Sequence, residues 1–177
     1  MNYATIKTHD VANGPGVRVS LFVSGCTHHC EGCFNPEAWD FGFGQPYTAE
    51  TEQSILDACD HPYIRGLSLL GGEPFEPANQ RALLPLLRRF RERFPDKTIW
   101  CYSGYNYELD MLSGKLGDWN VTKKMLHLID VLVDGEFHLE EKNLTLRFRG
   151  SANQRIIDVP RSLAHDQVLW WDGSREP

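Results

Sequence analysis

The sequence has no long hydrophobic run. None of its apolar stretches approaches the roughly 20 residues of a membrane-spanning helix. Its start, MNYATIKTHD, has no basic segment followed by an apolar one, so we expect no signal peptide. A basic block is also missing, since the net charge is −6 and the arginine-rich residues 88–93 are best explained as the solvated face of a helix. These absences argue against membrane insertion and nucleic-acid binding, and they predict a cytoplasmic protein.

Cysteine is scarce, but three of the five cysteines are clustered. Cys26, Cys30 and Cys33 have the spacing C-x-x-x-C-x-x-C, just after a strand-like run. Thiols stay reduced in the cytoplasm, so the cluster predicts metal ligands rather than disulfides. Cys59 and Cys101 are isolated, and we expect them to be small buried side chains.

Three clustered thiols are compatible with two kinds of metal site. A cubane iron–sulfur cluster normally takes four cysteines, so three would leave one iron open to another ligand. A structural zinc site also has four protein ligands, and His28 or His29 could complete a Cys₃His site. The cysteines favour the cluster, and the two histidines are more simply explained as solvated loop residues.

The order of patterns along the chain predicts an α/β fold. Alternating or apolar runs predict strands at residues 17–24, 66–70, 98–102, 130–135, 144–148 and 156–157. Residues 1–11 are expected to form a short extended lead-in segment before the first of these strands. Helices are expected after Thr48, around residues 83–94 and at residues 121–128, and Pro85 predicts that the second of these starts late or kinks.

Strands that alternate with helices form mostly parallel sheets. A complete (β/α)₈ barrel needs about 250 residues, and this chain has 177. We therefore expect an open partial (β/α) barrel of about five or six mostly parallel strands. Residues 1–160 should form one domain, with residues 161–177 as a tail that packs on it or is partly disordered. Trp170 and Trp171 lie in this tail, and their role is open.

Candidate ligand-binding residues follow three of the expected strands, at the end where parallel α/β folds bind ligands. Gly71 and Gly72 let the main chain approach a ligand closely, and Glu73 has a charge suited to an amino group.

Tyr102 and Ser103 follow the next strand, and Asp134 ends the one after it. Tyr102 and Ser103 could bond a ribose or a methionine group, and Asp134 could bind a cation or an amine. Ordinary loop or core packing explains these three residues equally well.

The three-cysteine spacing, followed one strand–helix unit later by Gly-Gly-Glu-Pro, resembles the two motifs of the radical S-adenosylmethionine (radical SAM) enzymes. The resemblance implies a [4Fe–4S] cluster on Cys26, Cys30 and Cys33. It also implies S-adenosylmethionine on the open iron, with its amino group held by residues 71–73.

Further stretches resemble the activating enzymes of glycyl-radical enzymes, in the branch that serves anaerobic ribonucleoside-triphosphate reductase. These are NGPGVR at residues 13–18, CFNP at 33–36, VLVDGEF at 131–137 and RGSANQR at 149–155. The resemblance covers residues 1–157. One departure is Gly32, which stands where many radical SAM proteins have an aromatic residue against adenine, so the adenine contact is unassigned.

The resemblance implies reductive cleavage of S-adenosylmethionine and formation of a glycyl radical on the large subunit of the reductase. It also implies a one-electron donor such as flavodoxin. Three alternatives stay open at this point: an activase of another glycyl-radical enzyme such as pyruvate formate-lyase, an iron–sulfur electron carrier, and a zinc-binding module.

Overall fold

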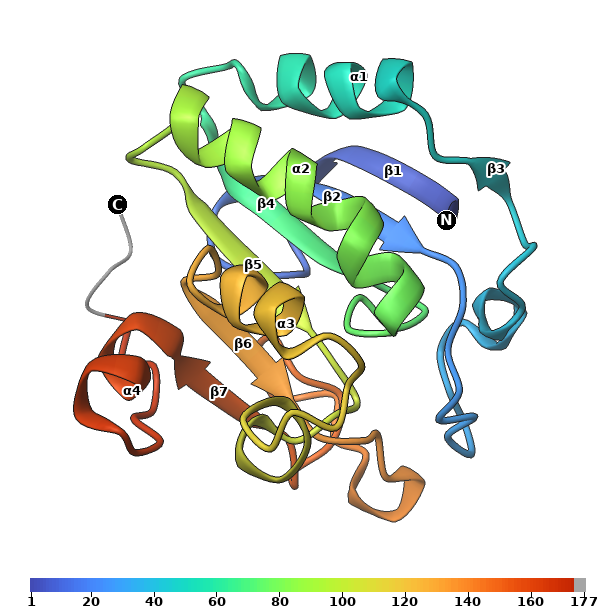
Figure 1. Ribbon diagram of the computed structural model, residues 1–177. Helices are drawn as coiled ribbons and strands as arrows, with labels where there is room; N and C mark the ends of the chain where they lie inside the picture. The colour runs from blue at the N-terminus through green and yellow to red at the C-terminus, as the bar shows by residue number, and fades with distance from the viewer. Residues whose placement is uncertain (174–177) are drawn as a thin grey trace.

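The computed structural model describes residues 1–173 and contains one seven-stranded sheet (Figure 1). The strand order is β3-β1-β2-β4-β5-β6-β7. The central strands are mutually parallel: β2 (Val17–Val23), β4 (Ile64–Gly71), β5 (Thr98–Tyr102) and β6 (Val131–Asp134). The outer strands pair antiparallel: β1 (Asn2–Asp10), β3 (Gln45–Pro46) and β7 (Arg155–Asp158). The α/β class is therefore confirmed, and the sheet stays open.

Three helices cover one face of this sheet (Figure 1). They are α1 (Ala49–Cys59), α2 (Pro77–Arg93) and α3 (Trp119–Leu126). A fourth, α4 (Val159–His165), follows β7 at the edge. Short turns of helix lie at Pro36–Trp39, Tyr107–Met111 and Leu139–Glu141. Within residues 1–173, no helix has the length and apolarity needed to cross a membrane.

The alternation of side chains along the strands divides the molecule into a core and an open face. Val19, Leu21 and Val23 of β2 point to the helices and are fully buried in the main core. The intervening Phe22 lies on the opposite face, where it lines a cavity together with Leu70 of β4. The helices thus leave one face of the sheet free to build a site.

Arg18 joins the central strands at the other end of this open face. Its guanidinium is buried and donates to Ser68 Oγ at 2.7 Å and to the Leu67 and Thr98 carbonyl oxygens at 2.9 Å. Burial lowers the pKa of Arg18 to about 10. Ser68 in turn donates to the Asn13 carbonyl at 2.6 Å, which holds the NGPG turn over the sheet.

Several predictions about the elements need correction. The sheet has seven strands, not five or six, because the lead-in is the full strand β1 and because the two-residue β3 has no sequence pattern to reveal it. Residues 144–148 do not form a strand, since no other strand lies beside them. The predicted strand at residues 156–157 is confirmed as β7. Helix α2 does not start late: it begins at Pro77 and contains Pro85.

The described part of the C-terminal tail contacts the open face of the sheet. The Trp171 ring lies 5.0 Å from the Trp100 ring of β5 and 6.3 Å from the Phe148 ring. Trp170 forms an isolated bridge with Ile157 of β7. The last four residues of the predicted tail, 174–177, lie outside the described residues.

Candidate functional site

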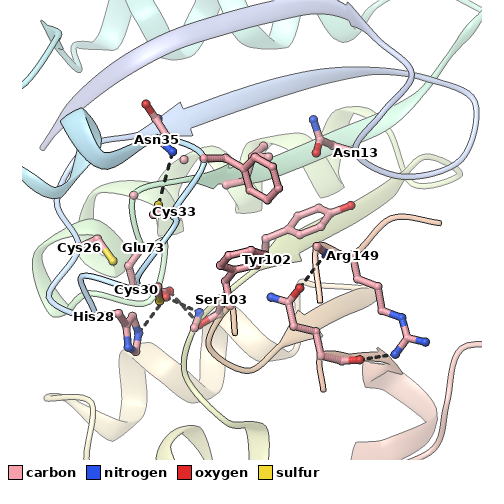
Figure 2. Close-up of a pocket in the computed structure, with 18 of the residues that line it drawn as sticks. Asn13, Cys26, His28, Cys30, Cys33, Asn35, Glu73, Tyr102, Ser103 and Arg149 are labelled. Atoms are coloured by element: carbon pink, nitrogen blue, oxygen red, sulfur yellow. Dashed lines mark hydrogen bonds and ion pairs between the residues drawn. The ribbon is translucent and has the colours of Figure 1, made fainter. Parts of the chain in front are cut away.

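A cavity of about 510 Å³ lies at the C-terminal ends of the parallel strands (Figure 2). Its size is within the range of about 300–1,000 Å³ that is usual for small-ligand sites. Its walls come from the cysteine loop after β2, from the ends of β4 and β5, and from the chain between β6 and β7. Eight of the nine site residues predicted from sequence line it: Cys26, Cys30, Cys33, Gly71, Gly72, Glu73, Tyr102 and Ser103.

The cysteine loop is held by hydrogen bonds on both sides. Gly25 N donates to the Ala38 carbonyl oxygen at 2.8 Å, which ties the loop to the turn that follows it. Thr27 Oγ1 donates to Glu76 Oε1 at 2.6 Å, which ties the loop to the start of α2. The three thiols are free and only partly buried, and burial raises the pKa of Cys26 to about 12. A thiolate there needs a compensating positive charge, which a bound metal supplies.

The three thiols line one cavity, as the ligands of an iron–sulfur cluster must. A cubane binds each thiolate on a different iron, so its ligands need only face one cavity. The histidines of the zinc alternative are also engaged elsewhere, because His28 pairs with two carboxylates and the His29 ring lies 4.7 Å from the Trp39 ring.

Glu73 links the ends of β4 and β5. The residue is 1% exposed, and its Oε1 accepts from Phe75 N and from Ser103 Oγ, both at 2.8 Å. Its Oε2 accepts from Gly104 N at 2.7 Å. The side chain of Glu73 is therefore committed to protein groups.

His28 was expected to be a solvated loop residue, but its side chain is only 9% exposed and connects three parts of the site. Its Nε2 lies 3.3 Å from Glu73 Oε2, and its Nδ1 lies 2.9 Å from Glu136 Oε1. Burial opposes a charge on this ring, but the two carboxylates outweigh it and raise the pKa of His28 to about 9. No local sequence pattern reveals this arrangement, because Glu136 follows His28 by 108 positions.

The two glycines before Glu73 are required by backbone packing. A Cβ at Gly71, whose φ is +107°, would lie 2.7 Å from the Val23 carbonyl oxygen. A Cβ at Gly72 would lie 2.6 Å from the Gly25 carbonyl oxygen. The close approach of the β4 end to β2 at Gly71 and to the cysteine loop at Gly72 therefore leaves no room for a side chain at either position.

The remaining predicted residues differ in how they meet the cavity. Tyr102 lines it, and among the described residues its buried hydroxyl has no hydrogen-bond partner, so it is available to a ligand. Burial also raises the pKa of Tyr102 above its usual value. Asp134 does not line the cavity, since its carboxylate accepts from Arg155 Nε at 2.9 Å and from Tyr107 N at 2.8 Å.

The segment between β6 and β7 supplies another wall of the cavity. Phe137, Leu146, Phe148, Arg149 and Gln154 all line it. The RGSANQR stretch was a signal for this wall, but nothing in its spacing shows that it faces the cysteines. Figure 2 shows Arg149 and Tyr102 on one side of the cavity and the cysteines with Glu73 on the other.

Residues 12–157 match the family model described as a 4Fe-4S single cluster domain. The matched range includes all three clustered cysteines and every strand of the parallel part of the sheet. Fold, site and match together define an iron–sulfur protein with one [4Fe–4S] cluster.

Comparison with known proteins identifies the particular family. The chain is 45% identical over 159 residues to the anaerobic ribonucleoside-triphosphate reductase-activating protein of Vibrio cholerae, covering 88% of this chain and 97% of that relative. It is 41% identical over 159 residues to the protein of the same name from Escherichia coli K12, with the same coverage. The protein of that name from phage T4 is 40% identical over 159 residues, 88% of this chain and 93% of the relative. The chain belongs to the family of anaerobic ribonucleoside-triphosphate reductase-activating proteins.

Proposed function

We propose that this protein is a radical SAM enzyme that generates a glycyl radical on the large subunit of an anaerobic ribonucleoside-triphosphate reductase. The observation that carries the proposal is that the three cysteines line the same cavity as Gly71, Gly72 and Glu73. A reduced [4Fe–4S] cluster supplies the electron that cleaves S-adenosylmethionine to methionine and a 5′-deoxyadenosyl radical, which takes a hydrogen atom from a glycine of the partner.

Each wall of the cavity has a distinct part in this proposal. Cys26, Cys30 and Cys33 would hold the [4Fe–4S] cluster, and the iron without a cysteine would be open to S-adenosylmethionine. The main chain at residues 71–73 binds the amino group, because the two glycines have no side chain that would block access to the main chain. The Tyr102 hydroxyl donates to the ligand.

The rest of the cavity wall shields the reaction from water. Phe22, Leu70 and Phe148 give the wall an apolar lining beside the cysteines. A carbon radical reacts with almost any nearby hydrogen donor, so exclusion of water and side reactants is part of the protein's contribution.

The names of the relatives support the reductase as the partner, in preference to pyruvate formate-lyase. Cluster potentials span roughly −700 to +450 mV, and this chemistry needs the low end. An external one-electron donor such as flavodoxin is therefore part of the proposal. An electron carrier or a zinc module would need no S-adenosylmethionine, which makes its cleavage the deciding observation.

The test is anaerobic purification with iron and sulfide analysis, then reduction by dithionite in the presence of S-adenosylmethionine. We expect about four irons per chain and equal amounts of methionine and 5′-deoxyadenosine. Cys30→Ala protein should lose both the iron and the cleavage. Cys59→Ala protein, which lacks a buried thiol outside the cavity, should keep both. Zinc in place of iron, with S-adenosylmethionine intact, would refute the proposal.

A further inference from the structure

Residues 142–151 form a loop beside the cavity. The loop is closed by a bridge between Lys142 and Ser151 and by a hydrogen bond from Asn143 N to the Gly150 carbonyl oxygen at 3.2 Å. Its sequence alternates as a strand does, but Leu146 points into the cavity while Leu144 is 85% exposed. Residues 144–148 are turns and bends, so the loop offers another chain exposed side chains rather than a strand edge.

Phe34 connects this loop to the cysteine loop. Its side chain is 66% exposed although it directly follows the third cysteine. The Phe34 ring lies 5.3 Å from the Phe137 ring, and Lys142 Nζ lies 5.0 Å from the Phe34 ring. A Cβ at Gly150 would come within 3.2 Å of Phe34, so the loop and the ring are in close contact. Two exposed apolar side chains therefore lie on the rim of the cavity, at Phe34 and Leu144.

The orientation of the loop depends on a strained residue. Phe148 has φ of +59°, a conformation that is a genuine outlier for a bulky side chain. Its ring is held 5.3 Å from the Trp100 ring, and the Arg147 guanidinium lies 4.9 Å from the Phe148 ring. This conformation puts Phe148 in the cavity wall and leaves Arg147 exposed at the rim.

The loop itself is cationic as well as apolar, and the two exposed carboxylates nearest to it in sequence, Glu140 and Glu141, directly precede it. Residues 142–154 carry three cations, Lys142, Arg147 and Arg149, and no carboxylate, in a chain whose net charge is −6. Lys142 and Arg147 are exposed. We call Phe34, Lys142, Leu144 and Arg147 together the lip.

We propose that the lip docks the glycine-bearing segment of the protein that receives the radical. The inference rests on the proposed function, in which a main-chain glycine must reach a cavity of about 510 Å³. A folded domain cannot enter that volume, so the occupant is an extended segment. An apolar side chain near its glycine packs on Phe34 and Leu144, and an acidic side chain pairs with Lys142 or Arg147. Among the described residues, the main-chain groups of Arg147 have no hydrogen-bond partner and can pair with this segment.

The test compares lip variants with matched controls elsewhere. The lip variants are Leu144→Asp and Arg147→Glu. The controls are Leu109→Asp, at a leucine that is 67% exposed and outside the cavity, and Arg88→Glu, at an exposed arginine of α2. Three quantities are measured: the Kd for the large subunit of the anaerobic ribonucleoside-triphosphate reductase, the glycyl radical by electron paramagnetic resonance, and S-adenosylmethionine cleavage with dithionite and no partner.

We expect each lip variant to raise the Kd roughly tenfold, as loss of one central contact does at protein interfaces, with a matching drop in the rate of radical formation. Cleavage without the partner should stay at the wild-type rate, because neither residue lines the cavity. Replacing an acidic residue near the partner's glycine by lysine should restore binding of the Arg147→Glu variant.

Two other outcomes separate the two proposals. Lip variants that bind and activate the subunit like wild type would overturn the docking inference and leave the proposed function intact. Wild-type protein that neither cleaves S-adenosylmethionine nor forms the radical would overturn the proposed function, and the docking inference with it.

Discussion

Glu73 is a buried carboxylate whose donors come from two strand ends. Phe75 N follows β4, while Ser103 Oγ and Gly104 N follow β5. Burying a carboxylate is costly unless hydrogen bonds satisfy it, and these three donors offset that cost. At the scale of single residues, Glu73 therefore determines how the Gly-Gly-Glu-Pro turn sits against the neighbouring strand.

The variant Glu73→Gln should lower the stability of the apoprotein. An amide keeps one acceptor oxygen, but its NH₂ group then faces a donor that had bonded to the carboxylate. An unsatisfied buried group costs about 1–3 kcal/mol, and each kcal/mol lowers Tm by about 2–4 °C at this chain length. Circular dichroism melting measures the change. Glu31→Gln, at an exposed residue of the cysteine loop, should melt like wild type. Equal melting of both variants would show that the Glu73 bonds contribute nothing.

The cysteine loop and the end of β4 form one unit at the scale of elements. Gly72 N donates to the Val23 carbonyl at 2.7 Å, and Glu73 N donates to the Gly25 carbonyl at 2.8 Å. Asn79 of α2 adds bonds to the carbonyl oxygens of Ser24 and Glu73. The loop that carries the thiols is thus positioned by the strand and helix that carry the Gly-Gly-Glu-Pro turn.

The variant Gly72→Ala tests this unit. The new methyl group would lie 2.6 Å from the Gly25 carbonyl oxygen and 2.9 Å from the Ala38 carbonyl oxygen, so the cysteine loop must move. We expect a loss of about 1–3 kcal/mol in unfolding free energy, as for other overpacked sites, and fewer irons bound after reconstitution. Gly42→Ala is the control, because its nearest neighbour, Asp40 Oδ1, is 3.4 Å away. Wild-type iron content in Gly72→Ala protein would contradict the described packing.

At the scale of the whole molecule, a second and smaller core lies on the open face of the sheet. Trp100, Val131 and Val133 form its buried part, and Phe148 and Trp171 pack against it. The helices do not cover this face, so the chain covers part of it with its C-terminal segment. The same cluster holds Phe148 in its strained conformation, which links the tail to the wall of the cavity.

The neighbouring tryptophans of the tail provide a matched pair of variants. Trp171→Ala should cost about 2 kcal/mol, less than a fully buried tryptophan because Trp171 is only partly buried. It should also weaken binding of the reductase subunit, since the Phe148 ring loses a partner. Trp170→Ala, at a side chain that is 56% exposed, should change the unfolding free energy by less than about 0.5 kcal/mol. Urea denaturation measures both. Similar midpoints for the two variants would rule out this packing role.

Local patterns in the sequence determined the elements and the chemistry of the site. Two such patterns correspond to strands of the structure: the period-two alternation from Val17 to Val23 is β2, and the apolar run at residues 98–102 is β5. Both patterns allow a strand to bury apolar side chains against helices. The clustered cysteines and the two glycines were also evident, since their spacing is a property of adjacent residues. Their roles with a cluster and S-adenosylmethionine stay predictions until the experiments above are made.

Only the tertiary structure decided which distant groups meet. The antiparallel direction of β1 and β7 depends on connections that no strand pattern encodes, and residues 144–148 have the pattern of a strand but no partner. The pairing of His28 with Glu73 and Glu136 likewise joins segments far apart in the chain. A sequence specifies which side chains prefer burial or charge pairing. Which residues become their partners is decided only when segments far apart in the chain pack together.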